Sequence, residues 1–281
     1  MMKKIVLLLA VGVILPVLSA RELRVISLSP ALTDAIVEIG AADLLCGRSS
    51  GCDAPGTKKI PIAGNMGYPN VEKILLLRPD YVISDTRHPG GNWKFLSRQG
   101  IKVLFLPGES LGDYPANIRK LGKILARENG AEKVAKKYEE KIAELRTSIP
   151  ANPRRVLIVF AVPPVISCGK QSFVNEALKL AGAANICGTV ERSYFTVSTE
   201  YILKSAPEVI ITTGVPETLV KKYFQRPEFR MVPAVKEQNF IAIDPDEFCR
   251  AGHKLPEAVA RLKRQISKNA VSPGAASHSL R

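Results

Sequence analysis

The chain has 281 residues, enough for two domains of ordinary size. Hydrophobic residues make up 46% and charged residues 23%, a balance that excludes an intrinsically disordered protein. A net charge of +14 is compatible with nucleic-acid binding, but the basic residues are spread along predicted amphipathic helices, as at Lys133, Lys136, Lys137 and Lys141. We therefore interpret the charge as solvated helix faces and expect no nucleic-acid partner.

The first 20 residues have the pattern of an export signal. Lys3 and Lys4 precede an uncharged apolar run at 5–15, which is too short to span a bilayer comfortably. Pro16 breaks the run, and Ser19-Ala20 supplies the small residues expected before a cleavage site. An N-terminal anchor helix is the alternative. We expect a cleavable signal peptide at 1–20 and a mature protein outside the cytoplasm, with a net charge of +12.

The five cysteines all follow the predicted signal, at Cys46, Cys52, Cys168, Cys187 and Cys249. An oxidising compartment permits disulfides, but an odd number of cysteines cannot all pair within one chain. The sequence leaves their connectivity open. Since no C-x-x-C spacing is present, a structural zinc site is not expected.

The first half of the chain alternates predicted strands with predicted helices. Clusters of β-branched and apolar residues indicate strands at 23–28, 44–47, 81–83 and 102–106. N-cap residues, helical periodicity and terminal Gly or Pro indicate helices at 33–39, 71–77 and 93–98. Such alternation predicts a parallel, doubly wound α/β sheet that is covered on both faces.

The second half repeats this plan. Residues 71–83 align without a gap with residues 199–211, so Glu72 falls opposite Glu200 and Pro79 opposite Pro207. A repeat of more than about 100 residues is too long for a solenoid and indicates two related lobes.

A long amphipathic helix separates the halves. Apolar residues recur at helical spacing from Ala131 to Leu145, and Pro150 and Pro153 close the segment. About 19 helical residues would span about 28 Å, a strut rather than a loose linker. We therefore predict two doubly wound α/β lobes joined by one rigid helix. The boundaries are 21–125 for the N-terminal lobe, 126–150 for the connecting helix, 151–266 for the C-terminal lobe and 267–281 for a flexible tail.

Several segments resemble, in their order and spacing, the periplasmic binding proteins for cobalamin and for iron–siderophore complexes. They are residues 25–30, 70–74, 78–83, the central helix, Pro163-Pro164 with Gly169-Lys170, and 230–236 before 241–244. The resemblance covers residues 23–266 and is closest to the cobalamin-binding branch. It implies a ligand cleft between two lobes, a periplasmic location and delivery of the ligand to an ABC permease in the inner membrane.

The resemblance also implies how the permease is engaged. One glutamate on each lobe of such proteins docks to arginines of the permease, and the matching residues here are Glu72 and Glu200. Each lies two residues after a good N-cap residue, Asn70 or Ser198, where the helix dipole alone already favours an acid. We expect a monomer without catalytic residues, without a bound metal and without a cofactor other than the transported ligand.

Ligand contacts are expected at the carboxyl ends of the strands, where open α/β sheets bind ligands. The candidates are Ser29, Pro30, Met66, Gly67, Tyr68 and Arg87 in the first lobe, and Pro164, Phe195, Asp246, Phe248 and Arg250 in the second. Tyr68 and Phe248 are suited to flank a flat macrocycle. The cobalamin branch often has tryptophans in these loops, and this chain departs from that pattern at Met66 and in the loop at 85–88.

The expected ligand is cobalamin or a related corrinoid. A ferric siderophore or haem is the alternative within the same family. An anionic siderophore would favour arginines in the cleft, and Arg48, Arg87 and Arg250 are the candidates for such contacts. His88 lies in a predicted cleft loop and is a candidate ligand for the iron of haem.

Two functions outside the family are disfavoured. Residues 47–51 match G-x-S-x-G, but a nucleophile elbow must enter a helix directly, and residues 52–56 have the composition of a loop. A site for bare zinc or manganese usually needs several imidazoles or clustered carboxylates, whereas the chain has only His88, His253 and His278.

Overall fold

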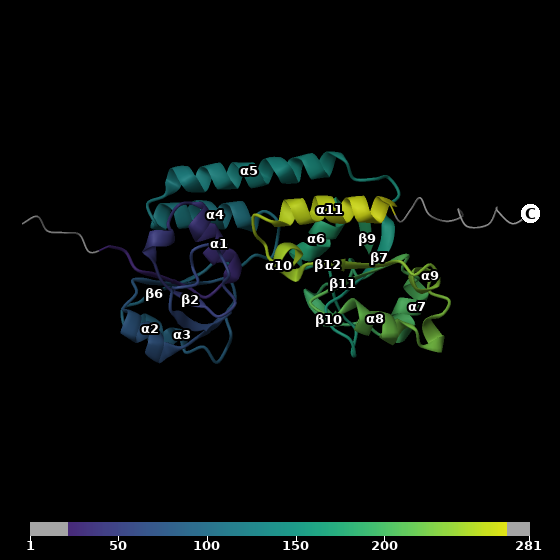
Figure 1. The fold of residues 1–281 in the computed structure, drawn as a ribbon, viewed down its shortest axis with the longest axis horizontal. Coiled ribbons are helices and arrows are strands. Elements are labelled where there is room, and N and C mark those ends of the chain that lie inside the picture. The colour runs from purple at the N-terminus through teal and green to yellow at the C-terminus, as the bar shows by residue number, and fades with distance from the viewer. Residues whose placement is uncertain (1–21, 269–281) are drawn as a thin grey trace, which may run out of the picture.

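The computed structural model describes residues 22–268, so the predicted signal peptide and residues 269–281 of the predicted tail lie outside the described residues. Two α/β lobes lie side by side, and helix α5 (Glu128–Thr147) runs along both of them (Figure 1). Within residues 22–268, none of the helices combines the length and the apolar character that crossing a membrane requires.

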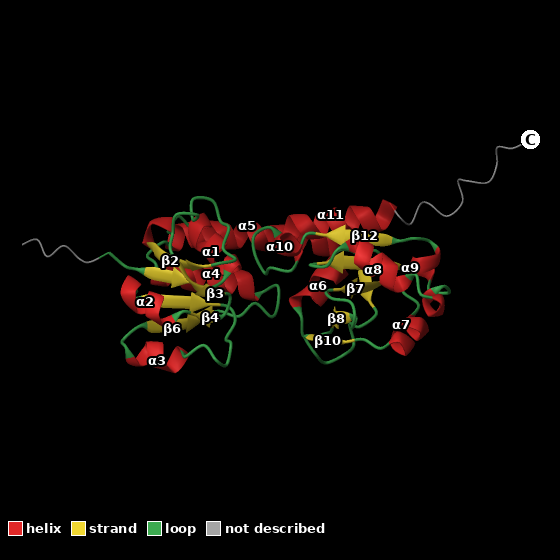
Figure 2. Ribbon diagram, turned by 60° about the horizontal axis from the view of Figure 1, so that its bottom comes forward, coloured by secondary structure: helices red, strands yellow, loops and turns green. Residues whose placement is uncertain are grey.

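The first lobe contains a six-stranded sheet in the order β4-β3-β2-β1-β5-β6. Its strands run parallel, except that β4 pairs antiparallel to β3 at the edge. Helices flank the sheet, as Figure 2 shows. The elements are β1 (Val25–Ser27), α1 (Pro30–Glu38), η1 (Ala42–Leu44), β2 (Leu45–Ser49), β3 (Ile62–Asn65), β4 (Tyr68–Pro69), α2 (Val71–Leu77), β5 (Tyr81–Ser84), α3 (Trp93–Arg98), β6 (Lys102–Phe105) and α4 (Asp113–Ile124).

The second lobe contains a parallel four-stranded sheet in the order β12-β11-β7-β9 and an antiparallel ribbon of β10 and β8. The doubly wound prediction is therefore confirmed for both lobes. The elements are β7 (Arg154–Val159), β8 (Ile166–Cys168), α6 (Phe173–Leu180), β9 (Ala183–Asn185), β10 (Tyr194–Thr196), α7 (Thr199–Ser205), β11 (Val209–Thr213), α8 (Glu217–Phe224), η2 (Pro227–Phe229), α9 (Pro233–Lys236), β12 (Phe240–Ile243), α10 (Pro245–Phe248) and α11 (Leu255–Lys268).

Helices α2 and α7 show the internal repeat in detail. Asn70 Oδ1 accepts the backbone N–H of Lys73 at 3.0 Å, and Ser198 Oγ accepts that of Tyr201 at 3.2 Å. Both helices end in a left-handed residue, Arg78 with φ 47° and Ala206 with φ 44°, and a proline follows each. Proline disfavours helical backbone in the residue before it, which stops both helices at the same point of the repeat.

Helix α1 starts three residues earlier than predicted. Ser29 is its N-cap, and Pro30 occupies the first helical position, where a missing N–H costs nothing and a fixed φ is favourable. The N-terminus of α1 therefore lies directly at the carboxyl end of β1.

The two lobes share one hydrophobic core on the side of α5. Helix α5 buries the stripe Ala131, Ala135, Tyr138 and Ile142. One continuous apolar cluster runs from β1 and α1 through α4 and α5 to α6 and α11. Two smaller clusters lie within the separate lobes. Packing of α4 and α11 against α5 thus joins the lobes over a broader contact than an isolated strut would provide.

None of the five cysteines forms a disulfide. Cys52, Cys168 and Cys187 are buried, and Cys46 and Cys249 are half-buried. Burial raises the pKa of Cys168 to about 12 and that of Cys249 to about 11, because a thiolate is poorly solvated in these surroundings.

Candidate ligand cleft

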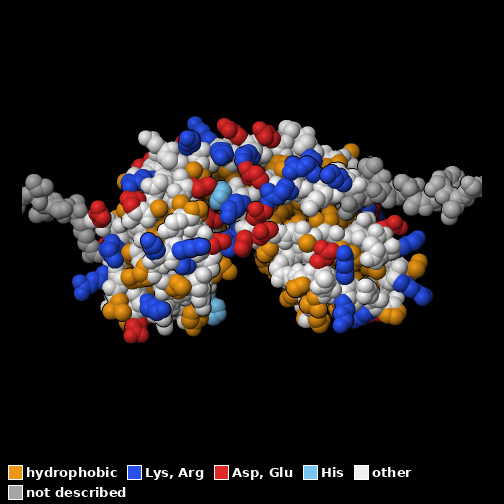
Figure 3. Space-filling model, in the orientation of Figure 1, with side chains coloured by type: hydrophobic (Ala, Val, Ile, Leu, Met, Phe, Trp, Pro, Cys, Tyr) orange, Lys and Arg blue, Asp and Glu red, His pale blue; other side chains and the backbone are white. Residues whose placement is uncertain are grey.

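A cleft of about 410 Å³ lies between the lobes. Figure 3 shows the surface hollowed there, below α5 in that view. The first lobe contributes Pro30, Ala31, Leu32, Met66, Asp85 and Thr86; the second contributes Phe173, Tyr194, Cys249, Arg250 and Ala251; residues 106–109, Tyr114 and Asn117 complete the lining. A cavity of this size and mixed character is typical of a small-molecule site.

Two strand ends build the wall of the first lobe. Ser29 follows β1 and Asp85 follows β5, and these strands are adjacent in the sheet. Ser29 Oγ accepts the N–H of Leu32 at 3.3 Å and donates to Asp85 Oδ2 at 2.5 Å. Burial raises the pKa of Asp85, and the hydrogen bond from Ser29 opposes that shift only in part.

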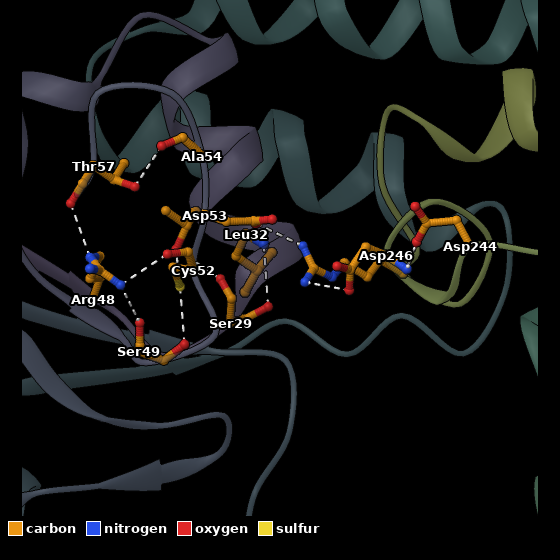
Figure 4. Close-up of polar contacts among 12 residues, drawn as sticks. Ser29, Leu32, Arg48, Ser49, Cys52, Asp53, Ala54, Thr57, Asp244 and Asp246 are labelled. Carbon is orange, nitrogen blue, oxygen red and sulfur yellow. Dashed lines mark hydrogen bonds and ion pairs between the residues drawn. The ribbon is translucent and has the colours of Figure 1, made fainter. Parts of the chain in front are cut away.

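A loop at 50–57 carries Asp53 into the space between the lobes (Figure 4). The guanidinium of Arg48 shapes this loop by donating to four backbone carbonyls: Thr57 at 3.0 Å, Cys52 at 2.9 Å, Ser49 at 3.1 Å and Lys58 at 3.4 Å. Cys52 Sγ lies 3.0 Å from the hydroxyls of both Thr33 and Ser49, which anchors the loop to β2 and α1. Asp53 is therefore presented by an ordered loop.

Arg250 of the second lobe spans the cleft to meet this loop. Its Nη1 lies 3.0 Å from Asp53 Oδ1, and its Nη2 lies 2.7 Å from Asp246 Oδ1, one helical turn earlier in its own lobe. The guanidinium is the main reason that the pKa of Asp53 is lowered. A second polar contact between the lobes joins His253 Nδ1 to Glu38 Oε2 at 3.5 Å.

Three of the predicted ligand residues line the cleft: Pro30, Met66 and Arg250. Met66 is 58% exposed, so its flexible thioether side chain is available to a ligand. Ser29 lies behind this surface, fully buried, where it caps α1 and orients Asp85. Asp246 is exposed and acts through its ion pair with Arg250.

The other predicted residues lie outside the lining of the cleft. Gly67 has a positive φ of 65°, and a Cβ there would collide with Thr86 Oγ1, so its role is conformational. Tyr68 packs edge-on against His88 with ring centroids 4.9 Å apart. The guanidinium of Arg87 lies 4.7 Å from the ring of Phe105, and Arg87 and His88 line a separate hollow beside α3.

In the second lobe, Pro164 is exposed, and Phe195 is half-buried against the core of that lobe. Phe248 is 1% exposed and belongs to the core shared by the lobes. The structure thus does not place Tyr68 and Phe248 as a pair of rings around a ligand. Helix α10 turns Phe248 inward while Arg250, two residues later, reaches the cleft.

Several lining residues carry no sequence signal that predicts a place in the cleft. Phe173, at the start of α6, and Tyr194, in the short ribbon of β10, follow no strand of the main sheet. The sequence predicts a strand at 102–106, whereas β6 ends at Phe105 and residues 106–109 form a loop that lines the cleft. Asp53 carries no local signal, because its partner lies 197 residues away.

The described residues contain no group of three or more His, Cys, Asp or Glu side chains arranged to hold a metal ion. Gly47 to Ser49 lie in β2 and a turn follows them, so the G-x-S-x-G match does not lead from a strand into a helix.

Two α/β lobes around a cleft with a mixed polar and apolar lining, with adjacent strand ends and ordered loops as its walls, define a bilobed ligand-binding protein. The chain belongs to the Periplasmic binding protein family, which it matches over residues 25–247. This family consists of substrate-binding proteins of transport systems rather than enzymes, and the resemblance to the cobalamin and siderophore importers is confirmed.

Similar proteins include both vitamin B12-binding and heme-binding proteins. A "Vitamin B12-binding protein" of Pectobacterium carotovorum subsp. carotovorum (strain PC1) is 28% identical over 260 residues, covering 90% of this chain and 91% of that protein. The periplasmic vitamin B12-binding protein of Vibrio cholerae has a TM-score of 0.74 at 25% identity, covering 88% of this chain and 98% of that one. The periplasmic heme-binding protein of the same organism has a TM-score of 0.77 at 22% identity, covering 86% and 98%, a likeness that shows the fold alone.

Proposed function

We propose that the protein captures cobalamin or a related corrinoid in this cleft and delivers it to an ABC permease. The charge of the cleft is the observation that favours this ligand. Arg250 is the one basic residue among the described lining residues, and carboxylates of Asp53 and Asp246 hold its guanidinium on both sides. Asp85 and Glu109 add two acidic residues to the same lining.

An anionic ligand would meet like charge in this cleft. The propionates of haem and the oxygens of a ferric catecholate are negatively charged, and like-charge juxtaposition opposes binding. The other arginines suited to such ligands are engaged elsewhere, since Arg48 donates to loop carbonyls and Arg87 stacks on Phe105. A corrinoid presents neutral carboxamides at its rim, and their N–H groups can donate hydrogen bonds to acidic side chains. The vitamin B12-binding proteins among the relatives support the same choice.

We also propose that Glu72 and Glu200 are the permease contacts. Both side chains are exposed, lie in the first turns of α2 and α7, and form no ion pair with any residue in 22–268. Leu75 and Leu203, one turn further on, are 37% and 40% exposed, so each glutamate has an apolar neighbour at the same repeat position. In Figure 1, α2 and α7 lie in different lobes on the side away from α5, an arrangement suited to the two halves of a symmetric permease.

A retention assay tests which ligand the protein binds. The purified protein is incubated with cyanocobalamin, haem, ferric enterobactin or ferrichrome and then desalted, and the absorbance of the retained ligand is recorded. We expect retention of cyanocobalamin with a Kd of about 1 μM or tighter. Retention of haem or a ferric siderophore without retention of corrinoid would transfer the assignment to that ligand.

A further inference from the structure

The carboxylate of Asp85 is the most confined acidic group in the lining of the cleft. Asp85 comes directly after β5, and its loop is tied down on both sides. Ser84 Oγ donates to the carbonyl of Thr86 at 2.7 Å, and the N–H of His88 donates to the carbonyl of Gly67 at 3.2 Å. A rigid loop holds a binding group in place before the ligand arrives, which lowers the entropy lost on binding.

Ser29 fixes the orientation of this carboxylate. The lone pairs of Ser29 Oγ accept the N–H of Leu32, so its single proton is free to point at Asp85 Oδ2, 2.5 Å away. Ser29 is fully buried, and water does not compete for that proton. The other oxygen, Asp85 Oδ1, is buried and accepts no hydrogen bond from any residue in 22–268.

Among residues 22–268, no cation forms an ion pair with Asp85. The guanidinium of Arg250, which lines the same cleft, is held by Asp53 and Asp246. A buried acceptor without a donor is costly, and a charged one more so. The raised pKa of Asp85 agrees with this geometry, because burial disfavours the carboxylate form. A ligand that brings a donor to Oδ1 would remove the penalty at the moment of binding.

We propose that Asp85, oriented by Ser29, is a subsite for an N–H donor of the ligand and selects a carboxamide over a carboxylate. The inference rests on the proposed function in that the ligand occupies this cleft, and it names the chemistry by which the ligand is chosen. A carboxamide donates to Oδ1, whereas a ligand carboxylate at the same position would place two acceptors and two negative charges against each other.

The experiment compares matched ligands and matched variants by calorimetry. The ligands are cyanocobalamin, its monocarboxylic acids, in each of which one side-chain amide is hydrolysed, and haem. The variants are Asp85→Asn, which keeps the size and the acceptor for Ser29 but turns an N–H toward the ligand, and Glu140→Gln. Glu140 is exposed on α5 and lies outside the lining of the cleft, so its variant controls for loss of charge alone. Circular dichroism and thermal melting verify that each variant is folded.

We expect wild type to bind cyanocobalamin at least about tenfold more tightly than one of the monocarboxylic acids, a difference of about 1.4 kcal/mol. Asp85→Asn should weaken cyanocobalamin binding about tenfold, largely abolish that preference and strengthen haem binding. Glu140→Gln should stay within about twofold for all ligands. Acidification should weaken cyanocobalamin binding in wild type, because protonation consumes the acceptor, and should have little effect in Asp85→Asn.

The outcomes separate the two proposals. If wild type retains haem and no corrinoid, the proposed function fails, but Asp85→Asn must still raise the affinity for haem if the inference is correct. If Asp85→Asn leaves the affinities for cyanocobalamin and haem within about twofold of wild type, the subsite does not exist, whichever ligand the protein carries.

Discussion

Arg250 and Asp53 form an ion pair across the ligand cleft, with Nη1 and Oδ1 3.0 Å apart although the two residues are 197 positions apart in the chain. Asp53 is 56% exposed at its side chain, whereas Arg250 is 19% exposed and also holds Asp246. The contact is therefore a partly solvated link between lobes that already share a core beneath α5.

The strength of this link is measurable by a double-mutant cycle. Because Asp53 is largely exposed, we expect a coupling free energy between Asp53→Asn and Arg250→Gln of about 0.2–1 kcal/mol from urea unfolding near neutral pH. Asp246 is present in all four proteins, so its contact with Arg250 does not enter the coupling. The pKa of Asp53 is lowered from its ordinary value of 3.8, so the stabilisation is present above that value and is lost as the pH falls below it. A coupling that persisted unchanged at about pH 2 would contradict this account.

The contribution of Asp34 to the stability of the fold should depend on pH in the opposite sense to that of Asp53. This residue of α1 is 8% exposed, and burial raises its pKa. An acid whose folded pKa is raised weakens the folded state at neutral pH, and that cost disappears as the pH falls through the folded pKa toward the ordinary value of 3.8. Asp34→Asn should therefore increase the free energy of unfolding at pH 7 and have little effect near pH 3. The exposed Glu140→Gln is the control, and a less stable Asp34→Asn at pH 7 would refute the prediction.

Charge reversal of Glu72 and Glu200, one in each lobe, should impair docking to the permease without impairing ligand binding. We expect Glu72→Lys combined with Glu200→Lys to leave ligand affinity within about threefold, or about 0.65 kcal/mol, because neither residue lines the cleft. Transport into vesicles that carry the cognate permease should fall steeply, and more than with either single change, since each single variant retains one contact.

The matched control places the same charge change on α5, as Glu140→Lys with Glu144→Lys. Both residues are exposed on the helix that lies away from α2 and α7 (Figure 1). Transport should be near normal in that variant. Normal transport by the Glu72 and Glu200 double variant would instead leave helix-dipole stabilisation as the reason for the two acids.

The lobes should move little when ligand binds. Helix α5 has 20 residues and packs against both α4 and α11, so closure would have to bend a helix or disrupt a shared core. X-ray scattering curves of free and loaded protein should nearly superimpose. Lys136 and Lys137 are both exposed on α5. Replacing them with Gly should destabilise the helix by about 1 kcal/mol per substitution and increase any difference between the scattering curves of free and loaded protein. A large decrease in the radius of gyration of wild type on loading would show hinge closure.

The thiols should react slowly in the native protein and completely after unfolding. Titration with a thiol reagent in guanidinium should detect five reactive thiols per chain. At about pH 8 the native protein should react slowly, because burial raises the pKa of Cys168 to about 12 and that of Cys249 to about 11, so little thiolate forms at either residue. Cys46 should react before the buried Cys52, Cys168 and Cys187, because it is only half-buried. Fewer than five thiols in the unfolded, unreduced protein would reveal a disulfide.

Local signals in the sequence determined much of the secondary structure. Helices α2 and α3 match their predicted bounds, since cap residues and prolines act within a few residues of where they stand. The order of the elements was sufficient to predict two parallel α/β sheets, and the gapless repeat placed Glu72 and Glu200 at the same point of two equivalent helices. Pro30 and Met66, which directly follow a strand or its turn, line the cleft in the structure.

The tertiary structure alone decided which side chains face the cleft and which face the core. Phe248 and Arg250 are two residues apart, yet one is buried among α10, α11 and the shared core while the other reaches Asp53. Burial and charge pairing are sums over contacts from distant segments, so no local pattern distinguishes these two residues. The unpartnered oxygen of Asp85 has the same origin, because its isolation depends on where Ser29, Arg250 and Asp53 lie in three dimensions.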